Sequence, residues 1–472
     1  MSIMSPITIS EQFLAMKSKD KTELFETSPI PKAVASLCIP TVVSSLVMIM
    51  YNLADTFFVG ELNNAVQNAG VTLAAPVLLA FNAVTNLFGV GTSSKMSRSL
   101  GKRDYETVAK TSAFGFYCSL FFAVMISLCC MIFREPLLTL LGADAETWKA
   151  TGDYLFWTVT CGAVPAIMNV IMSYLIRAEG ASLHASIGTM SGCILNIILD
   201  PFFILPQFLG LGAAGAGLAT FISNSAAMCY YLVLLYIKRG STYVCIDPRR
   251  FGFEGEIVKD VCWVGIPASI QNLLNVTGMT ILNNFTAGYD SAAVAAMGIS
   301  HKISLVPMYV SMGLSQGIMP LISYNFASGN VKRMKNTLSF TTAISMVLIV
   351  ILAALMYIFS GAVTTAFLND TQVIAYGTRF LRAMTLALPF LCFDFIAVAV
   401  FQACGMGGRS LIFAIARKLV LEIPALFVLD RIYPLYGLAY AQLVSELVLA
   451  AAAAFVLVFM FRRLERGDLQ AG

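Results

Sequence analysis

Charged residues are scarce in this chain, since Asp, Glu, Lys and Arg make up 12% of its 472 residues whereas hydrophobic residues make up 58%. Soluble domains carry about 25% charged residues, so a soluble protein of this composition could not cover its surface. The mean hydropathy is +0.80, and apolar runs of roughly 20 residues, each long enough to cross a hydrocarbon core of about 30 Å, recur along the whole length. The scarcity of charge therefore predicts a polytopic membrane protein.

Histidine is also scarce, with two residues, and the eleven cysteines show no metal-ligand spacing. Zinc chemistry is therefore not expected, and the cysteines are interpreted as free thiols in the apolar interior. Because the sequence has no His-metal cluster, no pair of catalytic acids and no nucleophile motif, we do not expect an enzyme, an organic cofactor or a nucleic-acid partner. The first thirty residues mix both signs of charge and lack an apolar h-region, so no cleavable signal peptide is predicted.

Apolar runs separated by polar breaks predict an all-α protein with twelve transmembrane helices. Their expected ranges are 34–59, 70–92, 106–132, 150–174, 182–204, 213–237, 257–284, 291–320, 336–359, 373–400, 410–429 and 435–461. With the N-terminus inside, 21 of the 30 Lys and Arg residues fall in segments expected on the cytoplasmic side and 3 in the external loops. Because cytoplasmic loops are enriched in Lys and Arg, this split predicts a multi-pass membrane protein with both termini inside. The bacterial cytoplasmic (inner) membrane is the location that the family resemblance given below implies.

The two halves of the chain resemble each other. Landmark residues recur at offsets of 225 to 228 positions: Pro40 with Pro267, Gly70 with Gly298, Gly89 with Gly317, Gly101 with Gly329, and Gly180 with Gly405. Six helices per repeat return the chain to the same side, so parallel repeats are expected. The predicted organisation is a tail at 1–33, an N-lobe at 34–237, a cytoplasmic loop at 238–256, a C-lobe at 257–462 and a tail at 463–472.

Two carboxylates lie deep inside the apolar segments of the N-terminal half. Asp55 stands three residues after Asn52, and Asp200 stands four residues after Asn196. These spacings place each amide and its acid on one helical face. A charge at the bilayer centre costs about 2.5–3.5 kcal/mol on insertion scales, and the spans at 34–59 and 182–204 contain no Lys or Arg that could pair with these acids. We therefore interpret both acids as functional.

A proline stands beside one of these acids. Pro201 directly follows Asp200, and because proline has no N–H, the carbonyl of Ile197 loses its helical partner. A carboxylate, an amide oxygen and a free carbonyl close together suit a hard cation such as Na⁺. Alternatively, a carboxyl group in an apolar setting can bind and release a proton near neutral pH. The sequence leaves H⁺ and Na⁺ open, with Asp55, Asn196 and Asp200 as the candidate ligands.

The predicted spans of the C-terminal half also contain polar residues, but their charged residues have more potential partners than Asp55 and Asp200 have in the N-terminal half. Lys418 and Glu422 are spaced i, i+4, which predicts a salt bridge, and Asp394 is a further embedded acid. Methionines at helical spacings suit a pocket that accepts varied apolar compounds, because thioether side chains are flexible. The candidate substrate contacts are Asn52, Asn272, Asn275, Met279, Met308 and Met312.

The twelve-helix layout and the stretches IPTVVSSLVMIMYNLADTFFVG, LIRAEG and LNIILDPFFIL together resemble the multidrug and toxic compound extrusion (MATE) family, its MepA-like bacterial branch in particular. The resemblance covers residues from about 30 to 460. It implies two pseudo-symmetric six-helix lobes in a V, with an N-lobe ion site matching Asp55, Asn196, Asp200 and Thr220. The NorM-like branch carries a glutamate where GIPASIQNLLNV offers only amides, so a C-lobe ion site is not carried over.

The resemblance implies a secondary active antiporter that exports cationic amphipathic drugs in exchange for H⁺ or Na⁺ by alternating access. Helix bending is expected at Pro40 and Pro201, and the protein is expected to act as a monomer in membrane lipid. The alternative is a flippase for lipids or lipid-linked oligosaccharides, which shares the wider architecture. Anionic pyrophosphate lipids require a cluster of Arg or Lys in the central cavity, and the spans of the N-terminal half offer no such cluster, which favours drug export.

Overall fold

The computed structural model describes residues 22–367 and 370–467, and within these ranges every regular element is a helix. Residues 1–21 and 468–472, which belong to the predicted tails, lie outside the described residues. The first half contains α2 (Ile30–Glu61), α3 (Ala65–Leu73), α4 (Ala75–Thr85), η1 (Asn86–Val90), α5 (Gly91–Gly101), α6 (Tyr105–Ile132), α7 (Arg134–Leu140), α8 (Trp148–Leu155), η2 (Phe156–Cys161), α9 (Ala163–Ala178), α10 (Ser182–Ile204) and α11 (Ala213–Ile237). The second half contains η3 (Pro248–Arg250), α12 (Gly255–Ala287), α13 (Ser291–Ala327), α14 (Val331–Ile358), α15 (Ser360–Phe367), α16 (Thr371–Ala403), α17 (Gly407–Ile415), η4 (Ala416–Glu422), α18 (Ile423–Ile432) and α19 (Tyr436–Glu465).

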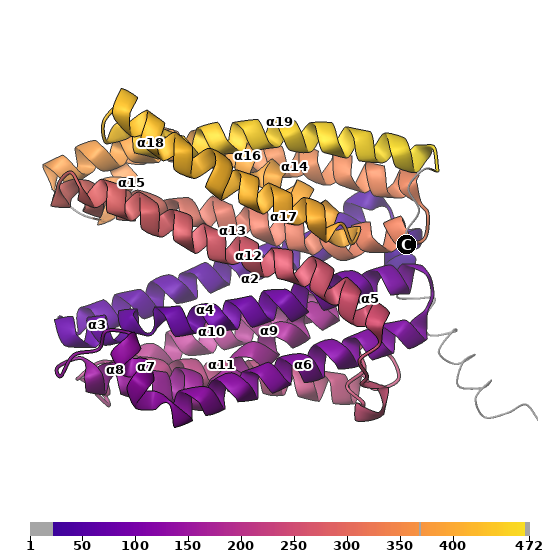
Figure 1. Ribbon diagram of the computed structural model, residues 1–472, viewed down its shortest axis with the longest axis horizontal. Coiled ribbons are helices and arrows are strands. Elements are labelled where there is room, and N and C mark those ends of the chain that lie inside the picture. Colours follow the sequence, from indigo (N-terminus) through magenta and orange to yellow (C-terminus); the bar gives the residue numbers. More distant parts are fainter. Residues whose placement is uncertain (1–21, 368–369, 468–472) are drawn as a thin grey trace, which may run out of the picture.

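The helices form two layers, with α3–α11 in the N-layer and α13–α19 in the C-layer (Figure 1). Two long helices pack against both layers. α2 lies along α10 of the N-layer and α13 of the C-layer, while α12 packs against α17 on one side and against η1 and α5 on the other. The first helix of each half of the chain therefore connects the two layers.

Nine helices among the described residues are long and apolar enough to cross a membrane, or ten if the bent pair Trp148–Cys161 and Ala163–Ala178 is one span. Two of the twelve predicted spans do not meet this criterion, namely α12 and the run from α17 through η4 to α18. Both are rich in polar residues, with several amides on α12 and three charged side chains on η4. Several of these polar and charged side chains line the cavity described below.

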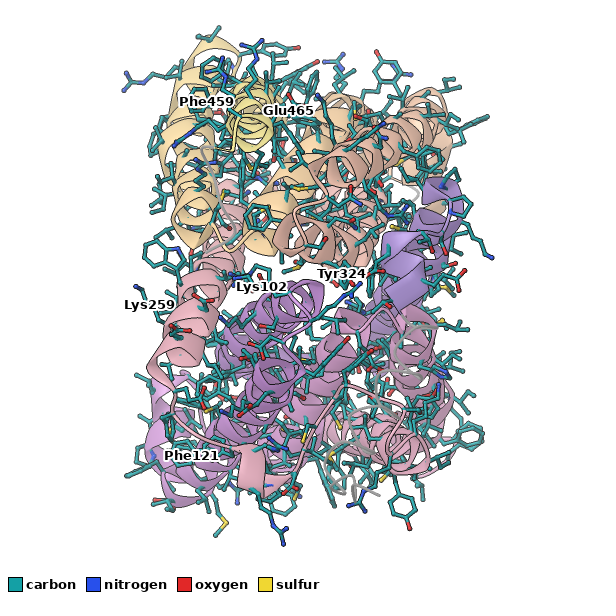
Figure 2. All side chains as sticks on the ribbon, turned by 90° about the vertical axis from the view of Figure 1, so that its right-hand side faces the viewer. Lys102, Phe121, Lys259, Tyr324, Phe459 and Glu465 are labelled. Atoms are coloured by element: carbon teal, nitrogen blue, oxygen red, sulfur yellow. The ribbon has the colours of Figure 1, made fainter. Side chains whose placement is uncertain are left out.

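The layers meet at one end of the molecule, called here the basic end after the Lys and Arg residues at positions 95–103 and 332–335. Figure 2 looks onto this end, and Lys102 and Tyr324 from the two layers lie near its centre. A Cβ added to Gly101 would lie 2.4 Å from the Tyr324 carbonyl oxygen, so the backbones touch. Polar contacts also cross the interface, from Lys95 to Asp260 at 2.8 Å and from the Ser94 hydroxyl to the Gln402 carbonyl at 2.6 Å.

A short segment ahead of α2, residues 22–28, is inserted into this interface. The Phe25 ring is fully buried and stacks on Tyr324 with centroids 4.9 Å apart. On its other side lies Gly180 (φ +87°), where a Cβ would come within 2.7 Å of the ring. Arg333 of α14 donates to the Phe25 carbonyl at 2.6 Å. Because Gly180 belongs to the N-layer and Tyr324 to the C-layer, Phe25 joins the two.

Replacing Phe25 by Ala is expected to loosen the basic end, because the missing ring leaves a void between the layers. Hydrogen–deuterium exchange of the purified protein should show amides 322–333 exchanging at least about tenfold faster, since losing a buried phenylalanine removes several kcal/mol of packing. The matched control is Thr27→Ala, because Thr27 is exposed and its hydroxyl bonds only the nearby Glu23 carbonyl. Unchanged exchange in the Phe25 variant would contradict the bridging role.

Candidate functional site

Asp200 lies near the end of α10 and is fully buried, as is Asn196 one turn before it. The Asn196 amide sits between Asp200 and Thr220 of α11. With its nitrogen turned toward Asp200, it donates to the two carboxylate oxygens at 2.9 and 3.2 Å, and its oxygen accepts from the Thr220 backbone N–H at 3.1 Å. This is the orientation in which the oxygen faces a donor and the nitrogen faces acceptors, which is how amides are assigned. The structure thus brings three predicted ion-site residues together.

Asp55 reaches the same region from α2, which packs along α10. Its Oδ1 is buried and has no hydrogen-bond partner. The charges of Asp55 and Asp200 act on each other, and Tyr154 of α8 lies within electrostatic reach of both. In the part of the chain that the structure describes, no Lys or Arg forms an ion pair with either acid. The two acids therefore form one anionic centre, with Asp200 buried and Asp55 half-buried, to which the described residues supply no basic counter-charge.

The amide predicted to complete this centre is placed differently. Asn52 is exposed and does not join the network around Asp200. The preceding residue, Tyr51, lies near Asp55 and Thr220 instead. Sequence reasoning missed Tyr51 and Tyr154, because aromatic residues in apolar spans give no signal that separates ring packing from a hydroxyl directed at an acid. Pro40 and Pro201 both lie inside continuous helices, α2 and α10.

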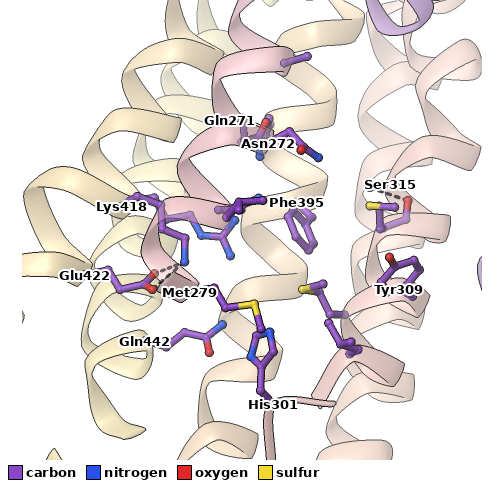
Figure 3. A pocket seen from close by; sticks show the side chains of 18 of the residues that line it. Gln271, Asn272, Met279, His301, Tyr309, Ser315, Phe395, Lys418, Glu422 and Gln442 are labelled. Carbon is purple, nitrogen blue, oxygen red and sulfur yellow. Dashed lines mark hydrogen bonds and ion pairs between the residues drawn. The ribbon is translucent and has the colours of Figure 1, made fainter. Parts of the chain in front are cut away.

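A second feature is a cavity of about 410 Å³ between the layers, lined mostly by the C-layer and α12. Figure 3 shows it with Gln271, Met279, His301 and Tyr309 around its wall. Five of the six predicted substrate contacts line it, which are Asn272, Asn275, Met279, Met308 and Met312. Asn52 does not line it. Neither Asp55 nor Asp200 lines it, so the anionic centre and the cavity are separate sites.

The charged wall of this cavity comes from η4, a π-helical segment of the kind often found at functional sites. The Nζ of Lys418 lies 2.6 Å from each carboxylate oxygen of Glu422, which confirms the predicted salt bridge. The neighbouring Arg417 is held 2.6 Å from Glu446, a fully buried acid on α19. Each cation of η4 therefore already has one carboxylate.

Behind this wall, Asp394 lies close to Glu446 and Arg417. Both Asp394 oxygens and one oxygen of Glu446 are buried and have no hydrogen-bond partner among the described residues. Asp394 is thus grouped with Arg417 and Glu446, a cluster that the sequence did not predict because its members lie on three helices far apart in the chain.

The N-layer also contributes to the cavity, through Asn82, Asn86 and Tyr174. Sequence reasoning missed these residues, although NAVTN at 82–86 places two amides four residues apart in an apolar run. That is the same kind of signal that identified Asn196 and Asp200. The four-residue spacing of these two amides could therefore have indicated that the second predicted span contributes to a polar site.

Comparison with known proteins identifies the family. Residues 40–202 and 267–428 both match the MatE family model, and the two segments begin at the prolines that the internal repeat pairs. The chain belongs to the MATE family. It is 31% identical to the multidrug export protein MepA of Staphylococcus haemolyticus over 93% of this chain and 96% of that protein. MepA of Staphylococcus aureus strain MRSA252 is 30% identical over 93% and 95%.

Solved structures give the same result. A multidrug resistance MATE transporter of the MOP superfamily in an outward-facing conformation has a TM-score of 0.89 at 26% identity, covering 94% of this chain and 98% of that one. A MOP superfamily transporter from Pyrococcus furiosus has a TM-score of 0.86 at 27% identity, covering 95% and 99%. The predicted fold class, an all-α membrane protein of the twelve-helix MATE type, is therefore confirmed.

Proposed function

We propose that this MATE-family protein is a secondary active multidrug efflux antiporter that exports amphipathic compounds carrying positive charge in exchange for H⁺ or Na⁺. The main support is the anionic centre of Asp55 and Asp200, which has no basic partner among the described residues and does not line the cavity. Such a centre can bind a cation in one state of the transporter and release it in another. The cation does not occupy the cavity in which the substrate would bind. The MepA relatives, named as multidrug export proteins, support the choice of cargo.

In this proposal, residues 34–237 and 257–462 act as the two moving lobes. The protein lies in the bacterial cytoplasmic membrane with the basic end inside, because Lys and Arg are enriched in cytoplasmic loops. Contacts across the basic end then close the cavity to the cytoplasm. The flippase alternative gains no support from the cavity, since Arg417 and Lys418 are each paired with a carboxylate and offer no free cluster for a pyrophosphate.

The orientation of Asn196 favours H⁺ over Na⁺ as the coupling ion. Its hydrogen-bonding neighbours assign its nitrogen, not its oxygen, to the side of Asp200. A sodium ion prefers oxygen ligands and would have to turn this amide away from both Asp200 and the Thr220 backbone. A proton needs only the carboxylate itself, because an apolar site favours the neutral form of an acid.

Transport by the purified protein in liposomes tests this function. With a fluorescent organic cation as cargo, an imposed proton gradient at equal sodium is expected to drive uphill movement, while a sodium gradient at constant pH is not. Protein-free vesicles give the background. Movement driven by sodium alone would overturn the choice of ion, and failure of both gradients to drive transport would overturn the antiporter.

A further inference from the structure

The charged pair in the cavity wall specifies a class of substrate. We infer that Lys418 and Glu422 form a recognition site for compounds that carry a cationic nitrogen and a carboxylate together, so that the pair opens and each member binds one charge of the compound. This inference rests on the proposed export function and deepens it. It concerns which charged compounds the cavity holds best.

The pair is built into the wall rather than displayed at a surface. Lys418 and Glu422 both line the cavity, and their side chains are 11% and 9% exposed. Gly278 of α12 makes room for them, because a Cβ there would lie 3.1 Å from Cδ of Lys418 and 3.5 Å from the Glu422 carboxylate. Figure 3 shows the pair facing Met279 and Gln442. A compound in the cavity can therefore reach both charges.

No other formal charge at the cavity is available to replace either member of the pair. Among the described residues that line it, the remaining strongly charged side chain is Arg417, which is held by Glu446 and lies over the Phe395 ring at 5.1 Å. His301 also lines the cavity, near Lys418. The cavity is therefore neutral as a whole, with one ammonium and one carboxylate that depend on each other.

This mutual dependence penalises a compound with a single positive charge. To bind Glu422, a monocation has to displace Lys418, and the displaced ammonium is left in the cavity without a counter-charge, which is unfavourable. A compound with both charges supplies a carboxylate to Lys418 at the same time as it supplies a cation to Glu422. The exchange then leaves no charge unpaired.

The rest of the cavity suits the body of such a compound. Six methionines line it, together with the aromatic rings of Tyr174, Tyr309 and Phe395. Thioether and aromatic side chains accept apolar bodies of varied shape. The volume of about 410 Å³ lies in the range of drug-sized sites, roughly 300–1,000 Å³. The expected substrate is therefore an amphipathic zwitterion with an apolar body.

Two dyes that differ in one group test the inference. Rhodamine B carries a cationic xanthene and a carboxylate, whereas its ethyl ester has the same fluorophore and only the positive charge. Fluorescence anisotropy with purified wild-type protein is expected to show at least about tenfold tighter binding of rhodamine B, since pairing of desolvated charges dominates such differences. Lys418→Met should reverse this preference, because Glu422 is then free to bind the monocation. Lys302→Met is the matched control and should keep the wild-type ratio, since Lys302 is exposed and does not line the cavity.

A charge-exchanged double variant keeps the inference testable if Lys418→Met does not fold. K418E/E422K keeps a neutral pair and is expected to retain the preference for rhodamine B. Equal binding of both dyes by the wild type, or a wild-type ratio in Lys418→Met, would overturn the inference. Liposome transport of the ester separates this outcome from failure of the proposed function. If the ester is transported but bound as well as rhodamine B, the zwitterion site is wrong and the antiporter stands.

Discussion

Replacing Asp200 by Asn is expected to reduce drug efflux to the background of vesicles without protein, while the amount of folded protein in the membrane stays at the wild-type level. Asparagine has nearly the shape of aspartate, and Asp200 makes no ion pair with a basic residue whose loss would strand a charge. What disappears is the ability to take up a proton or to balance a cation. Efflux of a fluorescent cation from energised cells, set against immunoblots of membrane fractions, measures both quantities.

The matched control is the same substitution at an exposed acid. Asp153 on α8 is 39% exposed and lies 3.9 Å from Arg134, a distance at which an ion pair contributes little. Asp153→Asn should leave efflux unchanged. Undiminished efflux by the Asp200 variant would remove the anionic centre from the mechanism, whatever the behaviour of the control.

Replacing Gly265 by Ala is expected to be the most damaging single-methyl change at the interface between the layers. A Cβ at this position of α12 would lie 1.9 Å from the Leu87 carbonyl oxygen of η1. Neither partner is the free end of a side chain, so two helix backbones have to move apart. We expect a loss of about 3 kcal/mol or more of the free energy of unfolding, seen as a lower midpoint of thermal unfolding and as aggregation in size-exclusion chromatography.

Gly298 provides the comparison for this variant. It also lies inside a long helix, α13, but a Cβ there meets nothing within 4 Å. Gly298→Ala should be neutral or stabilise by up to about 1 kcal/mol, because alanine is the better helix former. Equal behaviour of the two alanine variants would mean that the layers do not pack through Gly265.

The anionic centre could be predicted from the sequence because its signal is local. Asn196 and Asp200 stand one turn apart in an apolar run. Placing a carboxylate there costs enough free energy that its presence alone indicates a functional site. The separation of this centre from the cavity could not be predicted, since it depends on how α2, α10 and α12 pack. The predicted methionines and amides of α12 and α13 line one cavity because helical spacing puts them on one face of each helix. Their contact with substrate stays a prediction.

The charges of η4 show the limit of spacing arguments. The i, i+4 rule predicted the Lys418–Glu422 salt bridge correctly. It could not predict whether that salt bridge is enclosed by other side chains or lines a cavity. That distinction depends on Gly278, which lies 140 positions earlier in the chain and leaves room beside the pair. Asp394 and Glu446 meet for the same reason, through the packing of α16 against α19, and no local pattern announces their contact.

The contacts of the inserted segment at residues 22–28 constrain the order in which the protein can fold during its synthesis. Phe25 is synthesised 308 residues before Arg333, whose guanidinium donates to its carbonyl. Closing so long a loop is slow compared with forming neighbouring helices. Phe25 can therefore take its place between Gly180 and Tyr324 only after α13 and α14 have been synthesised.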